Sequence, residues 1–285
     1  MGLPCRNMEG GSHMGLFGKL FEKKECAICG VEIGLLGNRK LEDGNMCKNC
    51  AKRISPWFSE RRQSTVAQIQ DQLAYREENK GKVAAFQITR SLGESTKVLL
   101  DEDAGLFLVT SARDLAEANP DVLAFSDVTG CNLDIDESRT ELKREDREGN
   151  KISYQPPRYT YRYTFRMIIH VRNPYFDEIR FQLNDRSVEL ESEAPQRMAN
   201  AGVGRLLSGS ALRIDPEYNV AYRHYKQMGE EIQDALLHAR QAVRDASAAS
   251  AAEASQLAAP WSCPACGGQN ESGKFCEFCG TPRPQ

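Results

Sequence analysis

Eight of the ten cysteines in this 285-residue chain fall into four C-x-x-C pairs, two near the start and two at the end. The two sets are Cys26, Cys29, Cys47 and Cys50, and Cys263, Cys266, Cys276 and Cys279. Four thiolates complete a tetrahedral shell around Zn²⁺, and a closed shell leaves no position for a reactive water. We therefore expect two zinc ions per chain, both structural.

The residues around these cysteines favour metal binding over redox chemistry. Glycine follows Cys29, Cys266 and Cys279, where it permits a tight turn that points backbone N–H groups at sulfur. The Asp43-Gly44 pair marks a hairpin turn just before the second cysteine pair. A thiol-exchange motif would not need a second C-x-x-C at this spacing. Both modules are expected to be zinc ribbons.

A basic stripe is the second feature that could carry chemistry. In the segment RYTYRYTFRMIIHVR the apolar and aromatic residues from Tyr159 to Val171 alternate with polar ones. The candidate ligand surface on the polar side comprises Arg162, Arg166, His170 and Arg172. This stripe could hold phosphate or an acidic peptide. The alternative is a solvated face paired across strands with acids such as Asp134, Asp136 and Glu141.

The remaining reactive side chains do not suggest an enzyme. Cys131 stands at the head of a strand with no histidine or basic cluster beside it, so it is expected to be a small buried hydrophobe. His170, His224 and His238 occur in unrelated contexts. No pairing of a base with a nucleophile is evident, and we predict a protein without catalytic activity.

Composition and charge set the broad class of protein. The chain is 40% hydrophobic and 27% charged, with a formal net charge of -3, to which each zinc–tetrathiolate centre would add a further two negative charges. This acidity argues against bulk affinity for nucleic acid. Reduced cysteines, no signal peptide after Met14 and no long apolar run predict a cytoplasmic location. Residues 1–13 contain GSH directly before Met14 and are interpreted as a vector remnant.

A short amphipathic leader follows Met14. Its candidate membrane contacts are the apolar Phe17, Leu20 and Phe21 with the basic Lys19, Lys23 and Lys24. Such a segment could lie peripherally on an anionic membrane surface. The alternative is a leader that packs its two phenylalanines on the protein itself.

The pattern between the two metal modules predicts an α+β fold. Residues 65–82 form a helical pattern with a Thr65–Gln68 capping box and a stop at Gly81. Period-two alternation from Phe86 to Val188 predicts an antiparallel sheet curled into a small barrel or a sandwich, of which we favour the barrel. A long helix starting near Pro216 is expected to close this barrel, with self-association through residues 216–245 as the alternative.

The expected domains follow from these features. In chain order they are the vector remnant (1–13), the zinc finger with its leader (14–62), a connecting helix (63–84), the β domain (85–190), an irregular segment with the long helix (191–245), an Ala/Ser-rich linker that is partly helical and flexible (246–260) and the C-terminal ribbon (261–285).

Three short motifs carry a family resemblance. CAICG, LEDG and CKNCAK resemble the zinc-finger domain that heads an uncharacterised bacterial protein family. In that family a β domain similar to the pleckstrin-homology or GRAM type often follows, so the resemblance implies such a barrel here. The tail resembles the double-knuckle zinc ribbons at the ends of many bacterial proteins. None of these families implies a reaction.

These observations predict a binding protein. An adaptor that binds protein, and in one version also a membrane surface, accounts for two closed metal sites and a β platform. The alternative is a nucleic-acid-binding zinc-ribbon protein with a regulatory role. The basic residues Lys48, Lys52, Arg53, Arg61 and Arg62 near the first finger favour that second interpretation.

Overall fold

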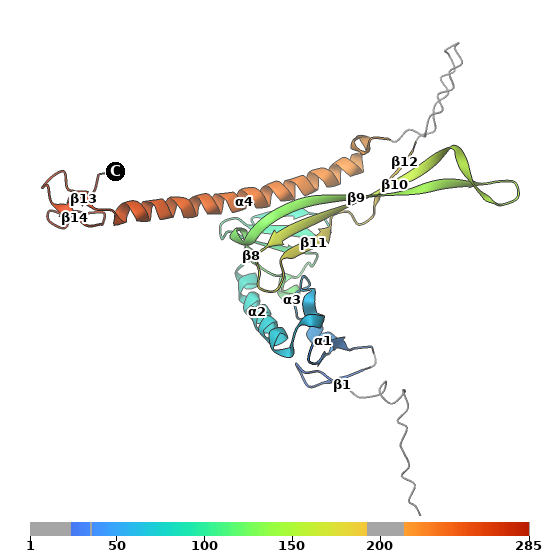
Figure 1. The fold of residues 1–285 in the computed structure, drawn as a ribbon, viewed down its shortest axis with the longest axis horizontal. Coiled ribbons are helices and arrows are strands. Elements are labelled where there is room, and N and C mark those ends of the chain that lie inside the picture. Colours follow the sequence, from blue (N-terminus) through green and yellow to red (C-terminus); the bar gives the residue numbers. More distant parts are fainter. Residues whose placement is uncertain (1–23, 35, 193–213, 285) are drawn as a thin grey trace, which may run out of the picture. The chain divides into compact units, whose positions relative to one another are not determined.

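The computed structural model describes residues 24–34, 36–192 and 214–284. The chain divides into two compact units, Met1–Glu78 and Asn79–Gln285. The division falls inside a helix, whereas the sequence suggested boundaries at either end of it (Figure 1). The amphipathic leader lies outside the described residues, except for Lys24.

The first unit consists of two short antiparallel hairpins followed by helices. Its elements are β1 (Lys24–Glu25), β2 (Glu32–Ile33), β3 (Arg39–Lys40), β4 (Asn45–Met46), α1 (Lys48–Ala51), the 3-10 helix η2 (Glu60–Gln63) and the start of α2 (Val66–Ala85). β1 pairs with β2, and β3 pairs with β4. Three of the metal-ligating cysteines are themselves part of the small core of this unit, beside Leu41, Met46 and Ile69. A core of this size needs further stabilisation, which a metal can supply.

Helix α2 begins as its sequence predicts. The Thr65 amide donates to Gln68 Oε1 at 2.9 Å, and the Gln68 amide donates to Thr65 Oγ1 at 3.3 Å, which confirms the capping box. The predicted stop at Gly81 is wrong, because α2 continues to Ala85. Val83 is buried with Leu99 and Leu108 of the second unit. Burial of this side chain offsets the cost of one glycine, about 1 kcal/mol relative to alanine.

The second unit contains two antiparallel sheets, a long helix and a small metal module. Its elements are β5 (Arg90–Gly93), β6 (Lys97–Asp101), β7 (Leu106–Thr110), α3 (Leu115–Ala118), β8 (Leu123–Ala124), η3 (Phe125–Asp127), β9 (Val128–Glu145), β10 (Lys151–Val171), β11 (Glu178–Gln182), β12 (Val188–Glu191), η4 (Pro216–Tyr218), α4 (Val220–Ala258), β13 (Trp261–Ser262) and β14 (Gln269–Asn270). The first sheet has the order β5-β6-β7-β8. In the second sheet β10 is central, with β9 on one side and both β11 and β12 on the other.

Strand β10 confirms the predicted alternation. Its side chains from Tyr161 to Val171 are buried at every second position, and Phe165, Met167 and Ile169 are fully inaccessible. Aromatic and β-branched residues suit such a half-buried strand, since they pack well on a pleated surface. This apolar face is the floor on which α4 lies (Figure 1).

The predicted closed barrel is wrong, and with it the pleckstrin-homology-like arrangement. The strands form two separate four-stranded sheets, and no pairing joins β8 to β9. β9 and β10 are 18 and 21 residues long, and they pair with each other as far as Glu145 and Lys151. Among the described residues, β12 pairs with β10 only as far as Thr160, so the distal part of the hairpin has two described strands. Alternation in sequence identifies a buried face, but it does not specify which strands pair.

Helix α4 packs on the second sheet and does not close a barrel. The Tyr222 ring contacts the rings of Tyr163 and Phe165 edge-on, with centroids 5.0 and 5.1 Å apart. Gly229, which interrupts the apolar register of the helix, lies against the Leu133 side chain of β9. A Cβ at this position would be 2.5 Å from Leu133 Cδ1 and 2.8 Å from Cδ2. The missing side chain therefore permits the close approach of helix and strand.

The segment expected to be a partly helical linker is helical as far as Ala258. α4 continues without interruption to Ala258, over 39 residues, and its side chains from Arg244 to Gln256 are exposed on all sides. Alanine has the highest helix propensity, so an Ala/Ser-rich stretch can extend a helix that tertiary packing has already nucleated.

Replacing Gly229 with alanine tests the close packing of α4. We expect Gly229→Ala to destabilise the second unit by about 1–2 kcal/mol in urea denaturation, because the new Cβ displaces the whole Leu133 side chain. In a Leu133→Ala background the same substitution should be stabilising, since alanine then only improves helix propensity. Gly81→Ala in α2, where a Cβ meets nothing within 4 Å, is the matched control and should stabilise. A stabilising effect of Gly229→Ala in the otherwise unchanged chain would contradict the packing described.

Candidate metal centres

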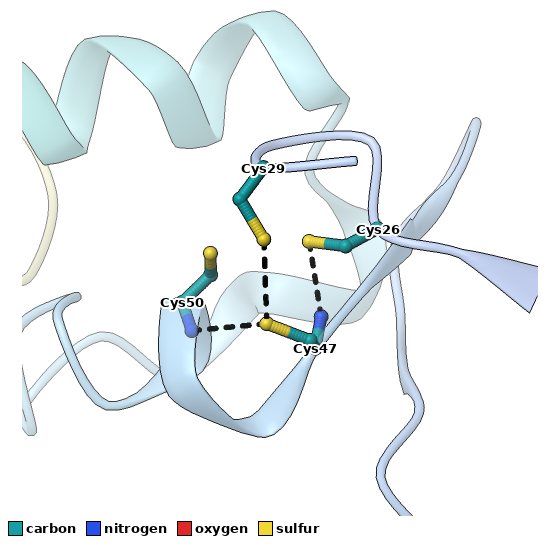
Figure 2. Close-up of side chains that lie close together, drawn as sticks. All are labelled: Cys26, Cys29, Cys47 and Cys50. Atoms are coloured by element: carbon teal, nitrogen blue, oxygen red, sulfur yellow. Dashed lines mark hydrogen bonds between the residues drawn. The ribbon is translucent and has the colours of Figure 1, made fainter. Parts of the chain in front are cut away.

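The first centre brings together two segments of the N-terminal unit. Cys26 and Cys29 lie between β1 and β2, Cys47 follows β4, and Cys50 lies in α1 (Figure 2). The four sulfur atoms lie within 4.8 Å of one another, and Cys29 Sγ is 3.8 Å from Cys47 Sγ. A zinc–tetrathiolate shell with bonds of about 2.3 Å has sulfur–sulfur edges of about 3.8 Å. The donor set and its spacing therefore fit one structural zinc ion.

Backbone donors stabilise the thiolates of this centre. The Cys47 amide donates to Cys26 Sγ at 3.2 Å, and the Cys50 amide donates to Cys47 Sγ at 3.4 Å. Burial opposes ionisation of Cys26, but the N–H groups of Cys47, Cys29 and Ile28 lower its pKa to about 6. Burial and the neighbouring sulfur atoms raise the pKa of Cys50. Ionisation of all four thiols thus needs a cation among them.

The two cysteine pairs of this centre are held differently, which corrects the predicted ribbon. Gly30 has φ 71°, and its amide donates to Cys26 O at 2.7 Å, so the first pair forms the expected knuckle. The second pair opens helix α1 instead, with Cys47 as its N-cap. Ala51 follows Cys50, in the place that glycine takes after the other three pairs. Ala51 indicates in the sequence that a helix replaces the knuckle here, because alanine disfavours the left-handed turn but suits a helix.

The LEDG turn attaches this centre to α2. Leu41 is fully buried, and Asp43 Oδ1 accepts a hydrogen bond from the Val66 amide at 2.7 Å, which caps the helix N-terminus. A Cβ on Gly44 would be 2.8 Å from Val66 Cγ2, so only glycine lets the turn approach the helix this closely. The first turns of α2 are therefore part of the finger.

The second centre has the predicted double knuckle. Cys263 Sγ is 3.5 Å from Cys279 Sγ, and Cys266 Sγ is 3.6 Å from Cys276 Sγ. The amides of Gly267 and Gly280 donate to Cys263 O and Cys276 O, each at 2.9 Å, and both glycines have positive φ. The set again fits one zinc ion. The structure thus brings together all eight predicted cysteines in the two expected groups.

Sequence reasoning missed two residues that support the second centre. Asn270 Nδ2 lies 3.6 Å from Cys276 Sγ, and Asn270 Oδ1 accepts from the Glu277 amide at 2.9 Å. Thr281 Oγ1 lies 3.1 Å from Cys279 Sγ. Burial opposes ionisation of Cys276, but backbone N–H groups of Phe278 and Cys279 and the Asn270 side chain lower its pKa to about 6. These groups orient the sulfur ligands and favour their ionised form.

The C-terminal ribbon docks on the end of α4. The Gly273 amide donates to Leu257 O at 2.8 Å, and Arg283 donates to Ala259 O at 3.0 Å. Lys274 Nζ lies 3.2 Å from a carboxylate oxygen of Glu253. The ribbon therefore supplies donors to carbonyl groups that the end of a helix leaves without partners.

The basic stripe of β10 consists of side chains that already have partners. Arg162 pairs with Glu189 at 2.6 Å, and Arg166 lies 3.6 Å from Asp136 and 4.0 Å from Asp134. His170 lies 3.9 Å from Glu178. Arg172 donates to Ser126 O at 2.9 Å. The two arginine–carboxylate pairs are the cross-strand arrangement that is the alternative to a ligand surface.

Cys131 is separate from both centres. Its side chain is buried on β9, and burial raises its pKa to about 12, which disfavours a nucleophilic thiolate. Lys24 is exposed in β1. The other candidate membrane contacts lie outside the described residues. Within the described ranges, every helix is too short or too polar to cross a lipid bilayer.

Zinc content tests both centres together. We expect elemental analysis of protein purified without chelator to find two zinc ions per chain, and one in either Cys29→Ser or Cys276→Ser. Iron also binds four thiolates, so a colourless preparation is part of the expected result. Cys131→Ser is the control and should retain both ions. One ion or none in the unmodified chain would contradict the assignment.

Hydrogen exchange tests the docking of the ribbon on α4. Loss of the second centre in Cys276→Ser should unfold the ribbon and remove the donors to Leu257 and Ala259. We therefore expect amides of residues 247–257 to lose protection, because that part of the helix has no buried face, while amides of 230–236 stay protected. Cys29→Ser should leave both segments unchanged. Equal protection of residues 247–257 in all three proteins would show that the ribbon does not stabilise the helix end.

Comparison with known proteins agrees with the first module. Residues 24–72 match the family described as "Domain of unknown function (DUF4428)". This range contains the first cysteine set and the turns of α2 that pack on it, as a zinc-finger-like domain would. Neither the curated proteins nor the solved structures contain a match to the chain.

Proposed function

We propose that this protein is a non-catalytic zinc-binding adaptor that binds a protein partner. Both cysteine sets are complete four-thiolate shells, which serve folding and leave no coordination position for a substrate. Reduced thiols at both centres suit a reducing compartment, so we place the adaptor in the cytoplasm.

The observation that carries this proposal is a pair of exposed aromatic rings on the C-terminal ribbon. Phe275 and Phe278 are 63% and 69% exposed, although a module this small has few other apolar side chains to bury. The Phe278 ring lies against Gly268, where a Cβ would be 2.5 Å from Phe278 Cδ2. The ring is therefore held in place by a glycine while most of its surface faces solvent. Exposed aromatic side chains at fixed positions are typical of protein contact sites.

The metal explains how so small a module can expose these rings. Among the described residues of the ribbon, the buried apolar cluster consists of Trp261 and two of the cysteines. Arg283 stacks over the Trp261 ring at 5.7 Å. A zinc-folded module does not depend on a large apolar core, so its phenylalanines are free to contact a partner.

A second candidate function is nucleic-acid binding through the first module. Burial and the nearby guanidinium groups of Arg39 and Arg62 lower the pKa of Arg61, so three arginines lie close together there. Lys48, Lys52 and Arg53 are also exposed on the same unit. A basic cluster of this kind could contact phosphates, although the chain as a whole is acidic.

Affinity purification from the source cells tests the adaptor proposal. We expect Phe275→Ser/Phe278→Ser to reduce recovery of a specific protein partner about tenfold or more, as loss of two aromatic anchors implies. Glu271→Ser/Glu277→Ser is the matched control on the same module and should retain the partner. Zinc content should stay at two ions in both variants.

Two further conditions distinguish the functions. Recovery of the partner should survive nuclease and mild detergent if the contact is between proteins. If recovery is lost with nuclease and with Lys52→Glu/Arg62→Glu, but not with the phenylalanine variant, the nucleic-acid function replaces the adaptor. If the phenylalanine variant and its control recover equal amounts of the partner, Phe275 and Phe278 do not contact it.

A further inference from the structure

A groove runs along one side of α4 in the second unit. Its volume is about 860 Å³. One wall is a stripe of α4 from Gln227 to Ala246, and the opposite side is formed by Arg90, Glu102 and Phe125. The α4 stripe recurs at steps of three and four residues, and the 19 residue steps from Gln227 to Ala246 correspond to about 28 Å of helix.

The floor of the groove is apolar and consists of the Phe125 ring and small side chains of α4. Phe125 is buried and stacks against Phe107, with ring centroids 6.1 Å apart. Ala235 is buried, whereas Ala239 and Val243 are only partly covered. Small residues along a helix let a second helix approach closely, as ridges fit into grooves.

The rim of the groove is acidic. Arg90 pairs with Glu231 at 3.0 Å, so these two charges offset each other. Glu102, Glu230 and Asp234 leave an excess of three carboxylates, all exposed. His238 is the other titratable side chain that lines the groove. An apolar floor between carboxylates attracts a ligand with an apolar stripe flanked by cations.

We propose that this groove binds a helical segment of a protein partner, with an apolar face flanked by lysine or arginine. The inference rests on the proposed adaptor function and specifies the chemistry of its partner. The length of the stripe and its three- and four-residue spacing fit a helix lying alongside α4. The rim selects for basic residues beside the apolar ones.

A second copy of α4 that runs parallel to the first fits this groove less well. An isologous contact between two parallel α4 stripes would bring Glu230 and Asp234 of each copy towards the same carboxylates of the other. Repulsion between like charges opposes that arrangement. Self-association through α4 is therefore the competing outcome of the test.

Binding of a model helix to the full zinc-loaded chain tests the proposal. The probe is a fluorescent 18-residue amphipathic peptide with leucines on one face and flanking lysines, measured by anisotropy. A peptide with glutamate in place of each lysine is the first control, and one with a central proline is the second. We expect the basic helix to bind, and both controls to bind about tenfold more weakly or not at all.

Variants of the chain locate the binding site. Glu230→Lys/Asp234→Lys should weaken binding of the basic peptide about tenfold or more, and the glutamate peptide should gain affinity. Glu145→Lys/Glu148→Lys changes the net charge equally at the β9–β10 turn, away from the groove, and should bind like the unmodified chain. Ala239→Trp fills the floor and should block the peptide without changing the rim charges.

Three outcomes would overturn the inference. The first is that the basic peptide does not bind the unmodified chain. The second is that both charge variants lose affinity for the basic peptide equally. The third is that the unmodified chain sediments as a dimer and that Ala239→Trp converts it to a monomer. None of these variants alters the ribbon. Partner recovery that still depends on Phe275 and Phe278 would therefore leave the adaptor proposal standing while the groove proposal fails.

Discussion

Burial of one face of β10 under α4 is the interaction on which the larger unit depends. The same strand holds the second sheet together, because β9, β11 and β12 all pair with its edges. The edge-on contacts of Tyr222 fix the start of the helix, and Gly229 permits its close approach to β9. Small residues at a helix–sheet contact shorten the distance between elements and increase the area that both bury. The groove along α4 exists because this contact leaves another stripe of the helix uncovered.

The extent of prediction differs between local and non-local features. The alternation from Tyr161 to Val171 and the capping box at Thr65 were readable because each depends on residues close together in sequence. The arrangement of the strands in two separate sheets was not readable from the sequence. Sheet closure depends on which distant strands pair, and no periodicity specifies this pairing. The uninterrupted helix over residues 246–258 was predicted only in part. Its alanines favour a helix, but the sequence alone does not show that the helix is nucleated by packing further upstream or that Arg283 and Gly273 contact its end.

The metal ligands were fully predictable because cysteine type and spacing determine them. The local backbone geometry around these cysteines was only partly predictable from the sequence. Glycine after three of the pairs indicated knuckles, whereas Ala51 indicated that Cys47 and Cys50 open a helix. Asn270 could not be recognised, because an asparagine between two cysteine pairs is common in any loop. Its role emerges only when the fold brings its amide to Cys276 Sγ. Such supporting groups depend on tertiary geometry, and their residue types carry little signal.

The two metal modules solve the problem of a small core in different ways. In the first, Ile69 and Leu73 of α2 add apolar surface to the cysteine cluster, and Asp43 ties the turn to the helix start. In the second, the described core adds Trp261 to its cysteines, and the module is hydrogen-bonded to the end of α4. A module with so little to bury depends more on its metal, since the thiolate–metal bonds replace apolar contacts as the source of stability. Exposed aromatic rings cost such a module little stability, because its fold never relied on burying them.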